Sequence, residues 1–197
     1  MNYNSIIKEI PLPIRLFLGK ALLFFICWEL IYGVFLFDSN AINNVLTKHV
    51  GEFSAKVLNH FTSMSGFFAK EEGYSEILGG ETLVYKSSAI YHNSHKVLNV
   101  ADACNGLELM VLYIGFIVCM PSKVMRKILY IILGVILLDS VNILRCAGLI
   151  YLREYTHVYF QFAHHYLFKI IVYSVTFLIW LFYSRKINLK NESLQIG

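Results

Sequence analysis

Three residues of types that can act together chemically lie in or beside apolar segments of this chain: Cys104, Arg145 and His164. A thiolate is a strong nucleophile, and a histidine can accept its proton and later return it to a leaving amine. Arginine stays charged, and its donors suit a developing oxyanion. Together these side chains suit acyl transfer through a thioester, with His165 as the alternate base.

Further polar residues accompany these three. Asp139, Asn142 and Arg145 recur at steps of three, so they share one side of a helix. We expect Asp139, Asn142 and Asn105 to orient or support the reacting groups. Taken one at a time, the same residues have simpler interpretations. Cys104 would be a structural cysteine, Asn142 and Arg145 would bridge helices with Asp139, and the histidines would be interfacial polar residues.

Composition limits the class of protein. The chain has 197 residues, of which 57% are hydrophobic and 15% charged, whereas soluble domains average about 25% charged residues. A soluble globule is therefore excluded. A net charge of only +4 speaks against nucleic acid as a partner. We expect one integral membrane domain over 1–197, with the lipid bilayer as its surroundings.

Four stretches are long and apolar enough to approach the roughly 20 residues that a spanning helix needs. They are 17–37, 107–120, 128–152 and 160–183. The second is the shortest of the four. Each polar group inside such a stretch is expensive in lipid, which makes it a candidate functional residue.

The cations flanking these stretches set the expected orientation. They form three clusters: Lys8, Arg15 and Lys20; Lys123, Arg126 and Lys127; and Arg185, Lys186 and Lys190. With all three in the cytoplasm, four spans thread without contradiction and both termini are cytoplasmic. Residues 38–104 and the loop 153–160 then lie outside an inner or plasma membrane. Cys104, Arg145 and His164 converge on that extracytoplasmic side.

The outer segment has patterns of its own. Apolar residues at steps of three and four indicate an amphipathic helix lying in the interface rather than spanning it. They are Leu46, Val50, Phe53, Val57, Phe61, Met64 and Phe68. The runs Glu81–Tyr91 and His95–Val100 could form a short β-hairpin leading toward Cys104. The expected fold class is an all-α polytopic membrane protein with about four spans, this helix and a possible hairpin.

Other functions remain open on the residues alone. Asp139, Arg145 and the two adjacent histidines could form an ion or proton path in a small transporter, and a non-catalytic assembly factor could keep a degenerate site. Histidines could also bind a metal, although none share an HxxxH step with a carboxylate between them: His92, His95, His157, His164 and His165. We expect no metal and no cofactor.

Three segments resemble the exosortase/archaeosortase family of polytopic membrane enzymes. Asp102–Leu109 is similar to the family's Ala-Cys-Ser-Gly turn, with Asn105 in place of the usual serine. Ser140–Arg145 resembles its Asn-x-x-Arg segment, and Ala163–Phe168 resembles its histidine at the start of a last helix. Many members carry glycine four residues after that histidine. Phe168 occupies this position relative to His164, so His165 stays possible.

The resemblance implies a short-form enzyme without an additional soluble domain. It implies a cysteine protease or transpeptidase that sorts secreted proteins, cleaving them near a C-terminal anchor. Such substrates carry a tail with a short motif, an apolar helix and a basic end. An amine or glycan acceptor, or water, would resolve the acyl-enzyme. By this resemblance Cys104 is the nucleophile, His164 the acid/base and Arg145 the oxyanion stabiliser.

Overall fold

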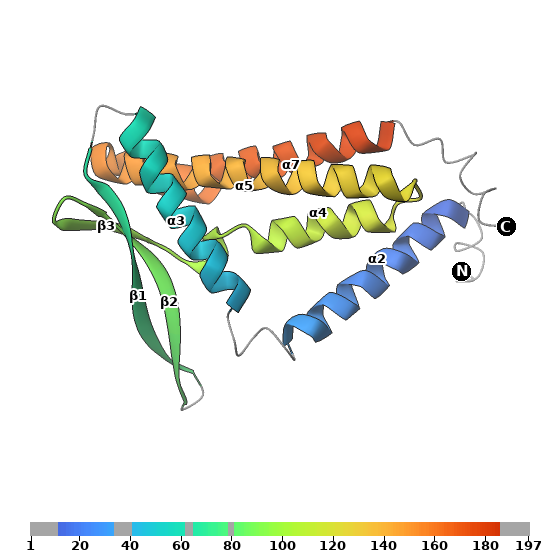
Figure 1. Ribbon diagram of the computed structural model, residues 1–197, viewed down its shortest axis with the longest axis horizontal. Helices are drawn as coiled ribbons and strands as arrows, with labels where there is room; N and C mark the ends of the chain where they lie inside the picture. Colours follow the sequence, from blue (N-terminus) through green and yellow to red (C-terminus); the bar gives the residue numbers. More distant parts are fainter. Residues whose placement is uncertain (1–11, 34–40, 62–64, 79–80, 186–197) are drawn as a thin grey trace, which may run out of the picture.

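The computed structural model describes residues 12–33, 41–61, 65–78 and 81–185. The elements follow in the order α2 (Leu12–Ile31), α3 (Ala41–Phe61), β1 (Phe67–Leu78), β2 (Glu81–His92), β3 (His95–Val100), η2 (Asp102–Cys104), α4 (Leu107–Cys119), α5 (Val124–Tyr155), α6 (His157–Phe162), η3 (Ala163–Leu167) and α7 (Phe168–Arg185). Helices α4, α5 and α7 form a bundle, and α3 and the sheet lie at one end of it (Figure 1).

Two helical segments of the described residues are long and apolar enough to cross a membrane: Val124–Tyr155, and His157–Arg185, which joins α6, η3 and α7. Helix α4 is apolar but shorter. Large apolar side chains stay exposed along these helices, which is the pattern of a surface that faces lipid. They include Leu129, Ile132, Leu133, Ile136, Ile170 and Phe177. The count of four spans stays a prediction.

The boundaries of the expected spans shift in the structure. The first overlaps α2, which begins earlier, at Leu12, and residues 34–37 lie outside the described part. The third and fourth become the longer α5 and α6–α7 segments. The expected outer loop 153–160 is wrong, because α5 continues to Tyr155 and α6 begins at His157. Only Thr156 separates the two helices, so α5 and α7 are held close together at this end.

The amphipathic helix is confirmed as α3, but its predicted length is wrong. It ends at Phe61, and Phe68 pairs with Tyr91 in the sheet instead. Met64 lies outside the described residues. The helix ends early because Asn59 bonds to the strand that follows. Its side chain donates to the Phe67 carbonyl at 2.7 Å and accepts from the Phe67 backbone N–H at 3.0 Å. These bonds fix the start of β1 beside α3, which periodicity alone does not reveal.

The all-α class needs correction, because three antiparallel strands form a sheet in the order β1-β2-β3. The expected hairpin is confirmed as β2 and β3, but β1 was missed. Strand β1 pairs with β2 along its whole length, from Phe67 opposite His92 to Leu78 opposite Glu81. Its sequence contains Lys70, Glu71 and Glu72 in succession, which breaks the alternation that marks a strand.

Two apolar clusters hold these elements together, and α5 contributes to both. The first joins α3 and the sheet to the second half of α5, through Val50, Ala55, Leu58, Phe67, Ile90, Val100, Ile143, Cys146, Ala147 and Ile150. The second joins α4 and α7 to the first half of α5, through Tyr113, Ile117, Leu138 and Tyr183. Helix α5 is therefore the common support of the bundle and of the α3–sheet region.

Candidate active site

Cys104 ends the short turn η2, which leads from β3 to the beginning of α4. Its side chain is partly buried against the cluster between α3, the sheet and α5. Gly106 follows with φ +83°, a left-handed conformation that favours glycine. A Cβ atom at Gly106 would also approach the Asn142 side chain to 3.2 Å. The thiol is therefore held just before the N-terminus of α4 by a sharp turn that packs directly on α5.

Asn105 fixes this turn from within. Its side chain is 1% exposed, and its amide donates to Asn43 Oδ1 at 2.9 Å and to Thr47 Oγ1 at 3.3 Å. The side-chain oxygen Oδ1 of Asn105 accepts a hydrogen bond from the Leu107 backbone N–H at 2.9 Å. This bond satisfies one of the unpaired N–H donors at the start of α4. Thr47 in turn donates to Asp102 at 2.8 Å. Helix α3 is thus bonded to both sides of the cysteine.

Asn43 and Thr47 were missed by the sequence analysis. They lie 62 and 58 residues before Asn105 in the chain. The apolar face of α3 was recognisable, but nothing in the local pattern indicates which turn its polar residues would meet. Both side chains are buried polar groups. Because buried polar groups need hydrogen-bond partners, their polar type was the available signal that these two residues bond to another segment.

Helix α5 brings Asn142 and Arg145 to the cysteine. Asn142 is buried and donates to the Cys104 carbonyl oxygen at 2.9 Å. Arg145 Nη2 lies 3.8 Å from Cys104 Sγ, and its Nη1 lies 3.5 Å from Asn142 Oδ1. The Arg145 Nε atom is buried without a hydrogen-bond partner among the described residues. The Arg145 guanidinium therefore contacts the sulfur of Cys104 and has one further buried N–H donor beside it.

Cys146, the next residue on α5, also contacts the turn. Its thiol is buried and lies 3.8 Å from the Cys104 carbonyl oxygen. The two cysteines are both free. Since Cys146 is buried while Cys104 is partly exposed, Cys104 is the thiol of this pair that a substrate can reach.

Asp139 has a different partner from the one considered in the sequence. Its Oδ2 pairs with His49 Nε2 of α3 at 2.9 Å, and its Oδ1 is buried without a partner among the described residues. The alternative in which Asp139 pairs with Arg145 thus has no contact to support it in the described structure. Asp139 instead joins α5 to α3 through His49.

The two adjacent histidines differ in their surroundings. His164 lies in the π-helical turn η3 and is partly buried, stacked on Phe160 at 5.8 Å between ring centroids. His165 is exposed, and its Nδ1 bonds to the Gln161 carbonyl of its own helix. Arg145 lies close enough to His164 for the two to interact electrostatically. The structure records no direct contact between Cys104 and His164 among the residues it describes.

Phe168 shows which face of this segment meets α5. A Cβ atom added at Gly148 would come within 2.6 Å of the Phe168 ring, so α5 and α7 approach closely at this glycine. Ala163, beside His164, is also buried, with 1% exposure. The buried face of η3 and α7 therefore contains His164 and turns His165 outward.

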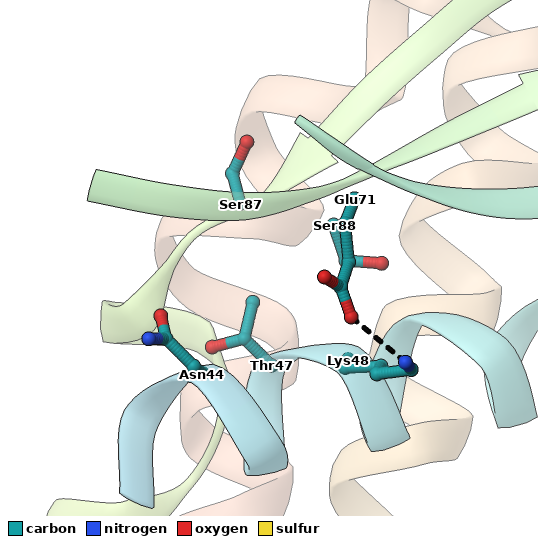
Figure 2. A pocket seen from close by; sticks show the side chains of 6 residues that line it. All are labelled: Asn44, Thr47, Lys48, Glu71, Ser87 and Ser88. Atoms are coloured by element: carbon teal, nitrogen blue, oxygen red, sulfur yellow. Dashed lines mark ion pairs between the residues drawn. The ribbon is translucent and has the colours of Figure 1, made fainter. Parts of the chain in front are cut away.

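A pocket lies between α3 and strands β1 and β2. Its lining residues are Asn44, Thr47, Lys48, Glu71, Ser87 and Ser88 (Figure 2). Lys48 and Glu71 form an ion pair of 2.8 Å across it, and the hydrogen bond and charge of Glu71 raise the pKa of Lys48. Cys104 is not among the lining residues, whereas Thr47 both lines the pocket and bonds to Asp102 of the cysteine turn.

Comparison with known proteins places this chain in a family. The model of the transmembrane exosortase family (Exosortase_EpsH) matches residues 11–182. The chain therefore belongs to the transmembrane exosortases, and it is a membrane protein. No significant match was found among curated proteins or among solved structures.

Proposed function

We propose that this protein is a membrane-embedded cysteine protease or transpeptidase, with Cys104 as nucleophile. The observation that supports this proposal most strongly is the 3.8 Å approach of the Arg145 guanidinium to the Cys104 sulfur. A charge is expensive in a membrane protein unless it has a role or a partner. Here the charge lies at a partly exposed thiol, in a chain of the exosortase family.

The proposed reaction has two halves. The Cys104 thiolate attacks the carbonyl carbon of the scissile peptide bond, and a C–S bond forms while the carbonyl oxygen becomes an oxyanion. Arg145 donates hydrogen bonds to that oxygen. When the C–N bond breaks, the leaving amine takes the proton that His164 received from the thiol. An incoming amine, hydroxyl or water then attacks the thioester carbon and gives its proton to His164. The new C–N or C–O bond forms as the C–S bond breaks, and the leaving Cys104 thiolate takes that proton back from His164.

The length of α5 supports a location of Arg145 and Cys104 near the extracytoplasmic edge of the membrane. The helix has 32 residues, or roughly 48 Å at 1.5 Å per residue. If Val124 lies at the cytoplasmic boundary, a core of about 30 Å ends near Ile143. Arg145 and the cysteine turn are then at the extracytoplasmic boundary. Lys123 and Arg126 lie at the opposite end, as the distribution of cations requires.

This depth suits a substrate with a C-terminal anchor. Its apolar helix would lie in lipid beside the exposed apolar surface of the bundle, with its basic end in the cytoplasm. The peptide bond just outside the anchor would then meet the thiol at the boundary. We infer that four spans, cytoplasmic termini and an extracytoplasmic site in an inner or plasma membrane complete this arrangement.

The buried residues of α5 give little support to a transport path. Between Val124 and Asp139, the buried residues of this helix are Gly134 and Leu138. A proton or ion path through the bundle would need polar groups to continue past Asp139 toward the cytoplasm. The polar residues of α5 instead gather in its second half, around the thiol.

Substitution of the nucleophile tests the proposal. A secreted protein of the same genome with a motif, an apolar helix and a basic end is co-expressed with wild-type chain, Cys104→Ala, Cys104→Ser or Cys27→Ala. Cys27 is exposed on α2, outside the site. We expect processing by wild type and Cys27→Ala only, with all variants equally abundant in the membrane. Processing by Cys104→Ala would refute the covalent mechanism.

A further inference from the structure

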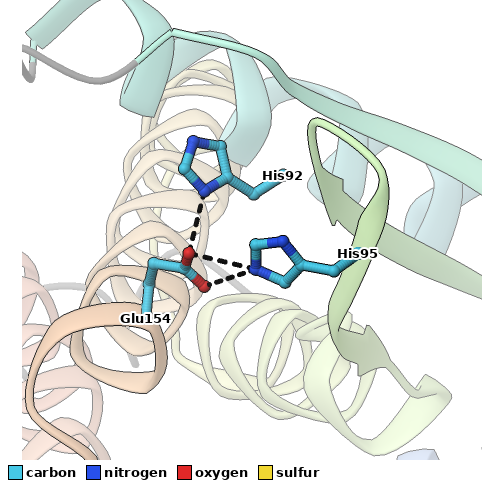
Figure 3. Close-up of side chains that lie close together, drawn as sticks. All are labelled: His92, His95 and Glu154. Carbon is cyan, nitrogen blue, oxygen red and sulfur yellow. Dashed lines mark hydrogen bonds and ion pairs between the residues drawn. The ribbon is translucent and has the colours of Figure 1, made fainter.

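Three side chains with metal-binding atoms converge at the outer end of α5, away from the cysteine. They are His92 and His95, at the ends of β2 and β3, and Glu154, in the last turn of α5 (Figure 3). His92 Nδ1 lies 2.8 Å from Glu154 Oε1, and His95 Nε2 lies 3.1 and 3.2 Å from the two carboxylate oxygens. The three ligand atoms all lie within 4.8 Å of one another.

The geometry of the hairpin places both rings on one side. His92 and His95 flank a two-residue turn and are direct partners in the β2–β3 pairing. Partners opposite each other in an antiparallel ladder project from the same face. Asn93 takes the left-handed conformation that such a tight turn needs, with φ 54°. The sequence His-x-x-His therefore presents two imidazoles on one face here, although it lacks the helical HxxxH spacing.

The His92 ring is held in position by packing. It stacks on Phe67 at 4.3 Å between centroids with an interplanar angle of 12°. Its side chain is 16% exposed, and that of Glu154 is 18% exposed, whereas His95 is 58% exposed. Two ligands are thus preorganised in a sheltered site and the third can move to complete it.

The position of Glu154 favours a cation. The carboxyl end of a helix carries partial negative charge, so an acidic side chain in the last turn is unfavourable unless a positive charge compensates it. The neighbouring Arg153 does not fill this role, because its guanidinium lies over the Phe160 ring at 5.2 Å. A bound divalent ion would neutralise both the carboxylate and the helix end.

We propose that His92, His95 and Glu154 bind one Zn²⁺ ion. Two imidazole nitrogens and one carboxylate oxygen form a ligand set that zinc accepts, with the fourth position left to water. Ligands at about 2.0–2.1 Å from a tetrahedral ion are roughly 3.3 Å apart. The observed separations of 2.8–3.2 Å between the carboxylate and the rings need to change by only a few tenths of an ångström.

The ion would join the two segments that carry the cysteine and the arginine. His95 precedes Cys104 by nine residues along β3 and η2, and Glu154 follows Arg145 by nine residues along α5. Nine helical residues correspond to roughly 14 Å, so the zinc site is remote from the thiol. Its effect would be to fix the strand and the helix relative to each other. Zinc binding itself does not depend on the proposed protease activity.

Direct titration tests the site. The full chain is purified in detergent without a polyhistidine tag, stripped with EDTA and titrated with ZnCl₂ in competition with a chromophoric chelator. We expect one ion per chain in the wild type. Loss of an inner ligand should exceed the 10–100-fold effect of losing an outer partner. His95→Ala and Glu154→Gln should therefore weaken binding by more than about 100-fold, and His60→Ala, an exposed histidine on α3, should not.

Two further measurements make the outcome decisive. Because His95 is exposed, His95→Ala should fold normally, and circular dichroism and gel filtration check this. Co²⁺ in place of zinc should give the visible absorption of a four-coordinate site in wild type and not in His95→Ala. Absence of saturable zinc binding in the wild type would overturn the proposal. So would zinc binding by His95→Ala and Glu154→Gln at wild-type affinity. The three side chains would then form only a hydrogen-bonded ion pair.

Discussion

The two halves of α5 both bury apolar residues, but they differ in the polar residues that they carry inside the fold. From Val124 to Leu138 the helix buries Gly134 and Leu138 against α4 and α7, and much of its remaining surface is apolar and exposed. Beyond Leu138 the same helix carries Asp139, Asn142 and Arg145 toward α3 and the cysteine turn. One continuous helix thus has an apolar half, residues 124–138, and a polar half, residues 139–155, which carries the polar side chains around Cys104 and also packs into the first apolar cluster.

This contrast predicts which substitutions should change the chemistry and which should change the stability of the fold. A change at Arg145 in the polar half, or at His164 in η3, should alter chemistry while leaving the bundle folded. A change in the apolar half should lower stability and leave the chemistry of the remaining folded protein intact. The following predictions test this division, beginning with the largest effect.

The adjacent histidines provide the largest expected difference. His164→Ala should lower turnover of the tail-anchored substrate by about 10²–10⁴, the usual contribution of a general acid/base. His165→Ala should be only mildly impaired, because that ring is exposed and bonded to its own helix. Initial rates of substrate cleavage provide the measurement. The reverse result would assign the role to His165, and two active variants would remove histidine from the mechanism.

Arg145 should be the next most sensitive position. Arg145→Lys keeps a positive charge but loses the planar fork of donors. Removal of one oxyanion donor typically lowers rates by about 10²–10³, so we expect a loss of that order. Alkylation of Cys104 by iodoacetamide should still occur in this variant, which checks that the thiol stays accessible.

Arg185→Lys, at the exposed end of α7, is the matched control and should behave as wild type. If Arg145→Lys retains full turnover, Arg145 serves only as a cation that bridges segments. Arg145 would then have a structural role, and substitutions in the two halves of α5 would no longer be expected to differ in kind.

The apolar half should respond in stability instead. A Cβ atom at Gly134 would lie 2.1 Å from the Tyr113 hydroxyl, which donates to the Tyr130 carbonyl at 2.6 Å. Gly134→Ala should therefore cost about 1–3 kcal/mol, as overpacked cores do, and lower the unfolding temperature in detergent. Turnover per folded molecule should be unchanged. Gly19→Ala is the control, because nothing lies within 4 Å of the new atom.

The smallest expected effect is on stability, and it comes from an ion pair in the sheet that packs beside the polar half of α5. Lys96 first, and then Tyr91, bond to Glu72 and hold the pKa of its carboxyl below the ordinary value of 4.5. Because the pKa is lowered on folding, this pair stabilises the fold above about pH 4.5 and is lost as the pH falls through the folded-state value. Glu72 is solvent-accessible at this pair, so the effect is small.

Glu72→Gln should accordingly unfold at a slightly lower temperature than wild type at pH 7. The difference should shrink at acid pH, where the wild-type carboxyl is protonated as well. A constant difference between Glu72→Gln and wild type across the pH range would contradict the role of the ion pair.

The apolar half of α5 was the easier part to predict from the sequence. A run of apolar residues specifies a helix in lipid without reference to anything distant, so α4, α5 and α7 were located within a few residues. The steps of three from Asp139 to Arg145 also placed these side chains on one face correctly. What the periodicity lacked was information about the partners on α3 and the sheet.

Those partners are distant in the chain. His49 meets Asp139 across 90 residues, and Thr47 meets Asp102 across 55. Strand β1 was missed for a related reason, since its charged residues suit a strand only once β2 lies beside them. The histidine pair of the hairpin was discounted because its spacing was judged against a helix. Local patterns predicted the elements, and tertiary contacts decided which polar residues meet.

The most direct test of the central claim is detection of the acyl-enzyme. Purified full-length chain is mixed with a peptide of the substrate tail, quenched in acid and mapped by mass spectrometry. We predict a thioester adduct on the peptide containing Cys104 that hydroxylamine removes, and no adduct in Cys104→Ser. An adduct on Cys146, or rapid cleavage with no adduct on any cysteine even in His164→Ala, would contradict the account.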